Sequence, residues 1–346
     1  MHMADALISP AVGGAMWAVS AGLVAYSSKK VSSEDQSSRT ALMGVLGAFV
    51  FAAQMINFTI PATGSSGHLG GGLILSILLG PYAGFIVMAS ILTVQALIFG
   101  DGGLLALGCN IFNLGFWTCF VAYPLIYKKI AGEKPTQGRI ITGSLLAAII
   151  GLQLGAFSVV IETMSSGISE LPFNTFVLLM QPIHLAIGIV EGVVTAAVVS
   201  FVWKAKPEIV AQGAGLKMNT PIKGVVIAIG IAAALIGGIL AWFASSQPDG
   251  LEWSMFRTAG KEELAAPADS IHKAFASIQE KTAILPDYNF KQTVSKSESE
   301  VAETSESWPG ISAGTSFAGI IGGILTLALA FLIGTVLRKA GNQAKT

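Results

Sequence analysis

The sequence predicts an all-α integral membrane protein, and composition together with a repeated apolar pattern supports this class. Hydrophobic residues make up 53% of the 346 residues, charged residues only 12%, and the mean hydropathy is +0.69. Soluble domains carry about 25% charged residues, so the composition argues strongly against a soluble enzyme. The chain has 20 Lys+Arg and 20 Asp+Glu, and this balance gives no reason to expect nucleic-acid binding.

Nine apolar segments are candidates for membrane-spanning helices, because a helix needs about 20 mostly apolar residues to cross a bilayer. The third is short and begins with glycines, so its depth in the membrane is open. The segments are Pro10–Ser27, Thr40–Met55, Leu69–Gly80, Tyr82–Phe99, Leu107–Ile126, Ile140–Ile161, Phe173–Val202, Gly224–Phe243 and Ala313–Leu337.

The distribution of Lys and Arg predicts the orientation of these spans. With nine spans, fourteen of the twenty basic residues fall on one side, which the positive-inside rule assigns to the cytoplasm. The other six lie between Arg257 and Lys296, in a long connection that escapes the rule. We therefore expect a multi-pass protein of a cytoplasmic membrane, with its N-terminus outside and its C-terminus in the cytoplasm.

The chain divides into two predicted modules. Residues 1–205 contain seven spans, residues 206–223 form a cytoplasmic linker, and residues 224–346 contain two further spans, here called the companion module. Between those two spans, residues 244–312 carry eleven acidic and six basic residues. This external acidic segment is either a small domain or a loose linker.

The common zinc-enzyme and nucleotide-binding motifs are missing from the sequence. It contains no HExxH or Walker A motif, and no GxGxxG before a helix. We therefore expect a transport component rather than an enzyme. Because the chain has no nucleotide motif, uphill transport would draw its energy from partner chains or from an ion gradient.

His2 and His68 are the residues with the clearest potential for metal binding. The amine of Met1 and the amide and imidazole Nδ1 of His2 can close two adjacent chelate rings, with donors near one plane. Square-planar Ni(II) and Cu(II) favour such donors, and Co(II) accepts them. His68 lies on the same predicted external face and could supply the fourth ligand. The alternatives are that His2 is an ordinary surface residue and that His68 bonds a carbonyl at a helix start.

Other polar residues lie inside the apolar segments. His184 and Glu191 share one helix face, and they form either a proton or ion path or a pair that joins helices. Gln95, Asn110 and Asn113 either bond to metal ligands or satisfy one another between helices. His272, in the external acidic segment, is expected to be solvated.

Small residues recur at helical spacing in the first and ninth spans. Gly14, Ala18 and Gly22 form one such stripe, and Gly319 and Gly323 form the other. Small stripes allow helices to approach closely, so they indicate either internal packing or a docking surface for another membrane subunit.

Five ordered motifs resemble the CbiM/NikM family, the metal-binding subunits of energy-coupling-factor transporters for cobalt and nickel. They cover about residues 1–205. In addition, residues 220–346 resemble the small companion subunit of the same systems, with Pro248–Glu252 similar to the motif of the PDGLE domain. The five motifs are Met1–Pro10, Ser66–Leu69, Gln95–Gly103, Ala106–Asn113 and His184–Gly192.

The resemblance implies a function, a ligand set and partners. It implies that nitrogens of Met1 and His2 hold Ni²⁺ or Co²⁺ together with His68. It also implies a membrane coupling subunit and two ATPase chains in a prokaryotic inner membrane, with cobalt uptake feeding cobalamin biosynthesis. The family commonly has a Gly and an aromatic residue where Asp5–Leu7 stand, which leaves the choice of metal open. A secondary transporter that uses His184 and Glu191 as a proton relay is the alternative.

Overall fold

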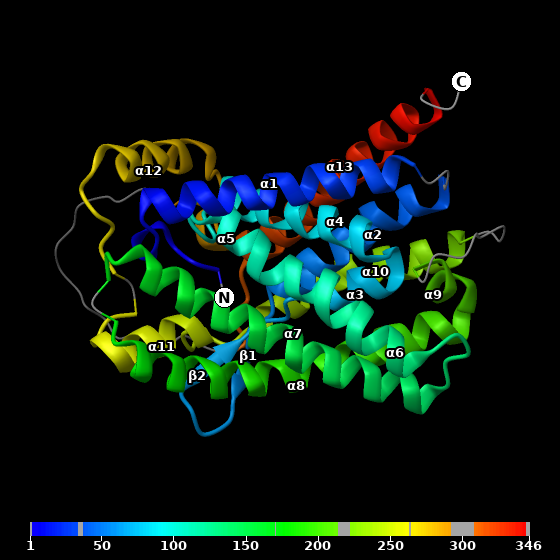
Figure 1. Ribbon diagram of the computed structural model, residues 1–346, viewed down its shortest axis with the longest axis horizontal. Helices are drawn as coiled ribbons and strands as arrows, with labels where there is room; N and C mark the ends of the chain where they lie inside the picture. The colour runs from blue at the N-terminus through cyan, green and yellow to red at the C-terminus, as the bar shows by residue number, and fades with distance from the viewer. Residues whose placement is uncertain are drawn as a thin grey trace.

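The computed structural model shows an elongated bundle of helices that run roughly along its long axis (Figure 1). It describes residues 2–33, 37–169, 171–213, 222–262, 264–291 and 308–343. The predominantly helical fold agrees with the predicted class.

Each of the nine predicted apolar segments contains a helix. In the first module these are α1 (Pro10–Ser32), α2 (Ser37–Gln54), α3 (Gly72–Leu79), α4 (Pro81–Val94) with the π-helix η2 (Gln95–Phe99), α5 (Leu107–Ile111) with the π-helix η3 (Phe112–Tyr127) and α6 (Lys128–Ala131), α7 (Gln137–Ser166) and α8 (Phe173–Ala205). In the companion module they are α10 (Lys223–Gly238) with the 3₁₀ turn η4 (Leu240–Phe243), and α13 (Ala313–Gln343). The predicted linker contains a further short helix, α9 (Pro207–Gly213).

Five helices in the described part of the chain are long and apolar enough to cross a membrane: Pro81–Phe99, Leu107–Ala131, Gln137–Ser166, Phe173–Ala205 and Ala313–Gln343. Arg39–Gln54 and Lys223–Gly238 are apolar but shorter. The protein is therefore a multi-pass membrane protein, whereas the predicted count of seven plus two spans is not established.

The third predicted span differs most from expectation. α3 has eight residues and is about 12 Å long, which is less than half of the roughly 30 Å hydrocarbon core. Before it, β1 (Phe58–Ile60) and β2 (Ser65–Gly67) form an antiparallel hairpin, followed by non-helical backbone. Such backbone is tolerated beside membrane helices only where protein surrounds it. Residues 69–71 are indeed buried.

Glycines make this close packing feasible. Gly71 has a φ of 75°, and a Cβ there would lie 2.4 Å from the Val50 side chain. A Cβ at Gly72 would lie 2.2 Å from the hydroxyl of Thr118. A larger residue at either position would push the loop that carries His68 away from α2 and η3.

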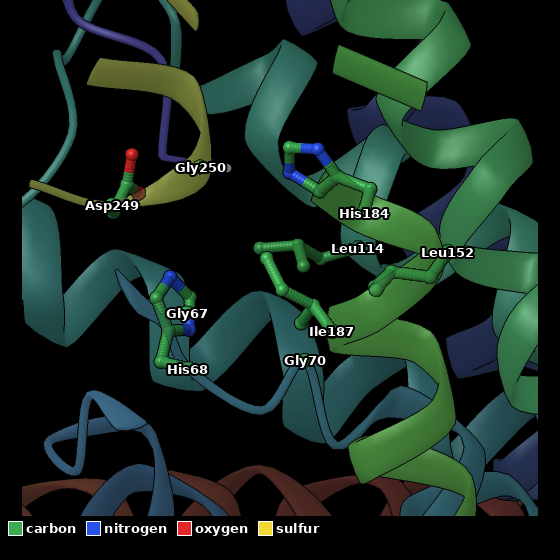
Figure 2. A pocket seen from close by; sticks show the side chains of 9 residues that line it. All are labelled: Gly67, His68, Gly70, Leu114, Leu152, His184, Ile187, Asp249 and Gly250. Atoms are coloured by element: carbon green, nitrogen blue, oxygen red, sulfur yellow. The ribbon is translucent and has the colours of Figure 1, made fainter. Parts of the chain in front are cut away.

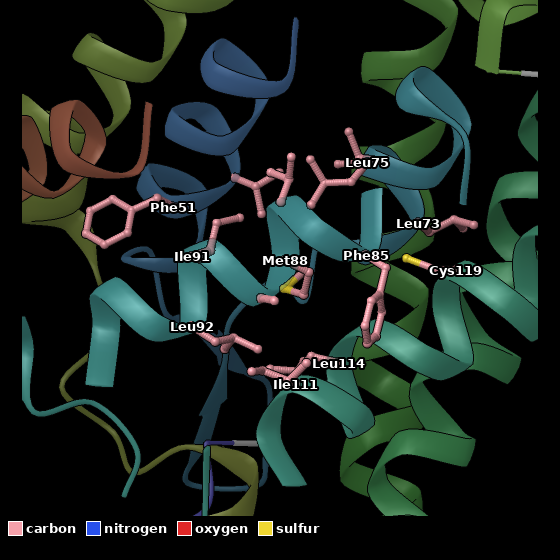
Figure 3. Close-up of a cluster of buried hydrophobic side chains, with 14 of the residues drawn as sticks. Phe51, Leu73, Leu75, Phe85, Met88, Ile91, Leu92, Ile111, Leu114 and Cys119 are labelled. Carbon is pink, nitrogen blue, oxygen red and sulfur yellow. The ribbon is translucent and has the colours of Figure 1, made fainter. Parts of the chain in front are cut away.

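The apolar core fixes the helices around this loop. Phe51 of α2, Phe85 and Met88 of α4, and Leu114 of η3 are buried together at the centre of the first module (Figure 3). Close-packed interiors resist small displacements, so the core gives the polar residues at one end of the bundle a rigid support.

The external acidic segment is folded where it is described. It forms α11 (Gly250–Ala259), α12 (Ser270–Thr282) and the 3₁₀ turn η5 (Pro286–Tyr288), which pack onto the end of the bundle that holds the N-terminal segment (Figure 1). Asp249 and Glu252 form a capping box at the start of α11, which satisfies its first N–H groups. In its described residues this segment consists of short helices packed onto the first module rather than a loose linker.

Basic residues gather at the opposite end of the bundle. Lys29 and Lys204 lie in the last turns of α1 and α8, and Arg338 lies near the end of α13. All three helices end on the side away from α11 and α12 (Figure 1). The ends of α1 and α13 touch, because a Cβ at Gly341 would lie 1.7 Å from the Ser32 carbonyl oxygen. These basic residues therefore lie at the end of the bundle away from α11 and α12, and the side of the membrane that this end faces stays a prediction.

The two stripes of small residues differ in their surroundings. On α13, a Cβ at Gly319 would lie 2.1 Å from the Gly237 carbonyl oxygen of α10, so this stripe serves internal packing. On α1, Gly14 and Gly22 have nothing within 4 Å of an added Cβ, and Ala18 is exposed. The stripe on α1 is therefore open along its outer face.

We predict that Gly319→Ala lowers the thermal stability of the full-length protein in detergent. The added methyl group meets α10 backbone and should cost about 1–3 kcal/mol, typical of overpacking. The matched control is Gly14→Ala, which adds the same methyl group in open space and should leave the melting temperature unchanged or slightly raised. Equal melting temperatures for the two variants would contradict the α10–α13 contact.

Candidate metal centre

His2 and His68 lie side by side, although 65 residues separate them in the sequence. Their rings stack with centroids 4.9 Å apart and planes inclined by 30°. The side chain of His2 is only 8% exposed. The structure thus brings together the two histidines that the sequence singles out, from the N-terminal segment and from the loop after β2.

Backbone hydrogen bonds anchor the N-terminal segment. Asn110 holds the Met3 peptide on both sides: its Oδ1 accepts from the Met3 N–H at 2.8 Å, and its Nδ2 donates to the Met3 carbonyl at 3.1 Å. The Gly103 N–H also donates to the Met3 carbonyl at 2.9 Å. Two residues further on, Asp5 Oδ1 accepts from the Ala106 N–H at 3.0 Å. These contacts fix the backbone directly after His2.

A second set of bonds anchors the loop that carries His68. Glu191 accepts from the N–H groups of Gly70 and Gly71 at 2.8 and 3.0 Å. Gln54 donates to the Gly70 carbonyl, and Gln95 donates in turn to Gln54, each at 2.8 Å. Gln95 and Glu191 therefore support the backbone next to a candidate ligand rather than contacting the ligand itself.

The nitrogens of His68 are suitably arranged for metal binding. Nδ1 lies 3.1 Å from the Leu69 carbonyl oxygen and donates to it, which directs the lone pair to Nε2. Burial lowers the pKa of His68 to about 3. At neutral pH the ring is therefore uncharged, as a metal ligand must be.

The nitrogens of His2 are arranged differently from the predicted chelate. Nδ1 lies 2.7 Å from Asp101 Oδ1, whereas Nε2 is buried and has no hydrogen-bond partner among the described residues. A chelate ring through Nδ1 therefore requires the contact with Asp101 to open. Alternatively, the ring can coordinate through Nε2 while Asp101 orients it, as carboxylates often do for metal-bound histidines.

Asp101 was not predicted as a site residue. Its second oxygen accepts a hydrogen bond from the Tyr288 hydroxyl of the companion module. Burial alone would raise the pKa of Asp101, but the charge of His2 and the hydrogen bonds from His2 and Tyr288 lower it to about 2. In the sequence, Asp101-Gly102-Gly103 indicates only a tight turn, and Tyr288 gives no signal.

His184 and Glu191 do not form the pair considered from the sequence. His184 Nδ1 bonds to the Met180 carbonyl of its own helix at 2.8 Å, whereas Glu191 bonds to Gly70 and Gly71. His184 instead lines a cavity of about 10 Å³ beside His68, Asp249 and Gly250 (Figure 2). A space of this size accommodates about one water molecule.

Asn113 contacts the N-terminal segment at the side chain of Met3. Its Nδ2 donates to Glu162 Oε2 at 2.7 Å and lies 3.6 Å from the Met3 sulfur. Asn113 therefore positions Met3 and Glu162, and it does not bond to Asn110. Glu162 is a further buried polar residue, and it was not predicted as a site residue from the sequence.

The companion module covers the His68 loop. The Ser66 N–H donates to the Pro248 carbonyl at 2.8 Å, and the Trp253 indole donates to the Thr63 carbonyl at 3.0 Å. A Cβ at Gly250 would lie 3.1 Å from the His184 ring. The start of α11 is thus seated directly on the hairpin and on α8 (Figure 2).

A larger cavity of about 470 Å³ lies between the modules, and His2 and His68 are among the residues that line it. Its carboxylates come from the two modules: Asp5, Asp101, Asp249, Glu252, Glu262 and Asp287. However, no group of three or more His, Cys, Asp and Glu side chains among the described residues forms a ready metal site. Side chains alone therefore do not complete the ligand set, and the predicted ligand Met1 lies outside the described residues.

Comparison with known proteins identifies the family. The model for the cobalt uptake substrate-specific transmembrane region, CbiM, matches residues 2–209, and the PDGLE domain model matches residues 223–339. A putative fused nickel transport protein, NikMN, of Archaeoglobus fulgidus is 31% identical over 342 residues, which cover 98% of this chain and 100% of that protein.

More distant relatives agree with this result. The cobalt transport protein CbiM of Geobacter sulfurreducens is 25% identical and covers 78% of this chain and 81% of its own length. A crystal structure of a truncated transition metal transporter is 30% identical, with a TM-score of 0.53, and covers 59% of this chain and 99% of its own. The chain therefore belongs to the CbiM family of nickel and cobalt transport proteins and carries a C-terminal PDGLE domain.

Proposed function

We propose that this protein captures Ni²⁺ or Co²⁺ from outside the cell as the metal-binding component of an ATP-driven uptake transporter. The observation that carries the proposal is the stacking of His2 on His68, with the backbone beside each ring anchored by buried polar groups. The bound ion is cargo, so the protein must hold it selectively and then release it.

The proposed donors are the Met1 amine, the amide and imidazole of His2, and Nε2 of His68. Four nitrogens near a plane suit Ni(II), and Co(II) accepts them. Gln95, Asn110, Asn113 and Glu191 contribute by holding the two backbone segments in place. Such supporting contacts commonly change metal affinity by 10- to 100-fold.

Nickel is the better-supported cargo. The relative that covers the whole chain and the fused LarMN protein of Lactiplantibacillus plantarum, 30% identical over 70% of this chain, are both named nickel transport proteins. The cobalt transport protein of Geobacter sulfurreducens covers 78% of the chain at only 25% identity. Titration with both ions under the same conditions tests this preference.

Energy for release comes, in this proposal, from two ATPase chains through a membrane coupling subunit. The open stripe of small residues on α1 gives that subunit a face on which a helix can pack closely. The alternative of a proton relay through His184 and Glu191 is less favoured, because these two side chains have separate backbone partners.

We predict that His2→Ala and His68→Ala each abolish binding of one Ni²⁺ per protein, measured by equilibrium dialysis of the full chain. Each change removes a ligand without creating a large cavity, so circular dichroism should show intact helices. His184→Ala is the matched control, since it removes a neighbouring buried imidazole and should retain binding. Full binding by both ligand variants would disprove the assignment.

We predict that one residue added before Met1 abolishes metal loading, although every side chain is still present. The extension moves the amine out of its chelate ring. The control is a single residue added after Thr346, at the opposite end of the chain, which should leave binding unchanged. Tight binding of one ion by the N-terminally extended protein would show that the amine is not a ligand.

We predict that Ser277→Cys reacts with a membrane-impermeant maleimide in intact cells, whereas Lys129→Cys reacts only after permeabilisation. Both positions are exposed, and they lie on the acidic external domain and at the basic end of the bundle. The native Cys109 and Cys119 are buried and provide the unlabelled background. The reverse labelling pattern would overturn the proposed orientation.

A further inference from the structure

His272 of the companion module is buried against the N-terminal segment, in contrast to the solvated position expected from its acidic surroundings. Only 2% of its surface is exposed. Its Nε2 lies 3.0 Å from the Ile8 carbonyl oxygen and 3.2 Å from the Asp5 carbonyl oxygen. On the other side of the ring, Nδ1 lies 2.6 Å from Asp269 Oδ2. The residue thus joins α12 to the backbone that follows His2.

The geometry requires a proton on both ring nitrogens. Carbonyl and carboxylate oxygens only accept hydrogen bonds, so each nitrogen of His272 faces an acceptor. In either neutral tautomer, one nitrogen lone pair would point at an oxygen. The imidazolium form, with two N–H donors, satisfies all three oxygens at once.

The local charges favour the same form. Burial by itself would lower the pKa of His272, but the hydrogen bonds to Asp269 and to the Ile8 and Asp5 carbonyls, with the charge of Asp269, raise it above the usual 6.5. The carboxylate of Asp5 also lies near enough to interact with His272. Asp269 and Asp5 are the charged groups that face the ring.

The position of these bonds explains why they matter for metal capture. The first module holds the N-terminal segment from one side, through Asn110 at Met3 and the Ala106 N–H at Asp5. His272 holds the same segment from the other side, at Asp5 and Ile8. Residues 3–8, which lie one to six residues after His2, are therefore clamped between the two modules.

We propose that His272, in its doubly protonated form, is a positioning residue that clamps the metal-binding N-terminal segment onto the companion module. The consequence for metal affinity rests on the proposed function, whereas the clamp itself does not. As a raised pKa requires, the clamp is complete below about pH 6.5 and is lost as the pH rises through the pKa of the folded protein. The proton lost at high pH leaves a lone pair facing two carbonyl oxygens, which opens the contact.

The first test is amide hydrogen exchange of the full chain between about pH 6 and about pH 9, corrected for intrinsic exchange rates. The amides of Met3, Leu7 and Ile8 are hydrogen-bonded in the clamped segment and provide the readout. Wild-type protection should decrease as the pH rises. His272→Gln should show low protection that does not vary with pH.

Two variants separate the clamp from a general role in folding. Asp269→Asn keeps the helix cap of α12 but removes the carboxylate, so the decrease in protection should move to lower pH. Lys273→Gln removes a positive charge from the adjacent, exposed position and should match the wild type. If His272→Gln does not fold, the shift in Asp269→Asn still tests the proposal. Wild-type protection that is independent of pH, or Asp269→Asn with an unchanged midpoint, would overturn it.

The second test measures Ni²⁺ affinity by competition with a chelator of known strength. His272→Gln should bind roughly three- to tenfold more weakly than wild type near pH 6.5, because a charged hydrogen bond that orders the segment is lost. The ratio should approach one at high pH, where the wild-type clamp is also open. A ratio that stays constant with pH would overturn the link to metal capture. If the wild type binds no Ni²⁺ at any pH, the proposed function fails, and the exchange experiment still decides the clamp.

Discussion

The pairing of the Asn110 side chain with the Met3 peptide is the contact on which the candidate metal centre depends. One amide side chain satisfies both the backbone N–H and the backbone carbonyl of the buried residue Met3. A buried peptide group without partners would cost several kcal/mol, so this pairing makes an inward position of the N-terminal segment feasible. Because Met3 is fixed, the ring of His2 is limited to a small volume beside His68.

The same principle applies to the second half of the centre. Glu191 on α8 and the Gln54–Gln95 pair hold the peptide groups of Gly70 and Gly71, next to His68. Both halves are therefore positioned through backbone groups, while the two histidine rings stack on each other. Nδ1 of each ring has a hydrogen-bond partner, whereas Nε2 of His2 has none among the described residues.

The sequence predicted that His2 and His68 lie close together, and the structure agrees, whereas their role as ligands stays a prediction. It did not predict contacts that depend on residues distant in the sequence. The helical class followed from composition, and His2 and His68 from the chemistry of nitrogen donors. The glycines after Asp101 indicated only a turn, and the acidic surroundings of His272 indicated a surface residue. In neither case does the local sequence reveal the distant residues that the side chain contacts. Likewise, hydropathy revealed that α3 is apolar but could not show that only eight residues are helical.

The companion module is joined to the first module by two kinds of contact. Its helices α10 and α13 pack closely against α2, away from His2 and His68. Beside the segments that carry the two histidines, its contacts include hydrogen bonds at Pro248, Trp253, His272 and Tyr288. Each such bond contributes only about 0.5–3 kcal/mol net, so each can open while the helix packing holds the module in place. For the proposed metal site, this division allows α11 and α12 to cover the two histidine segments without locking them.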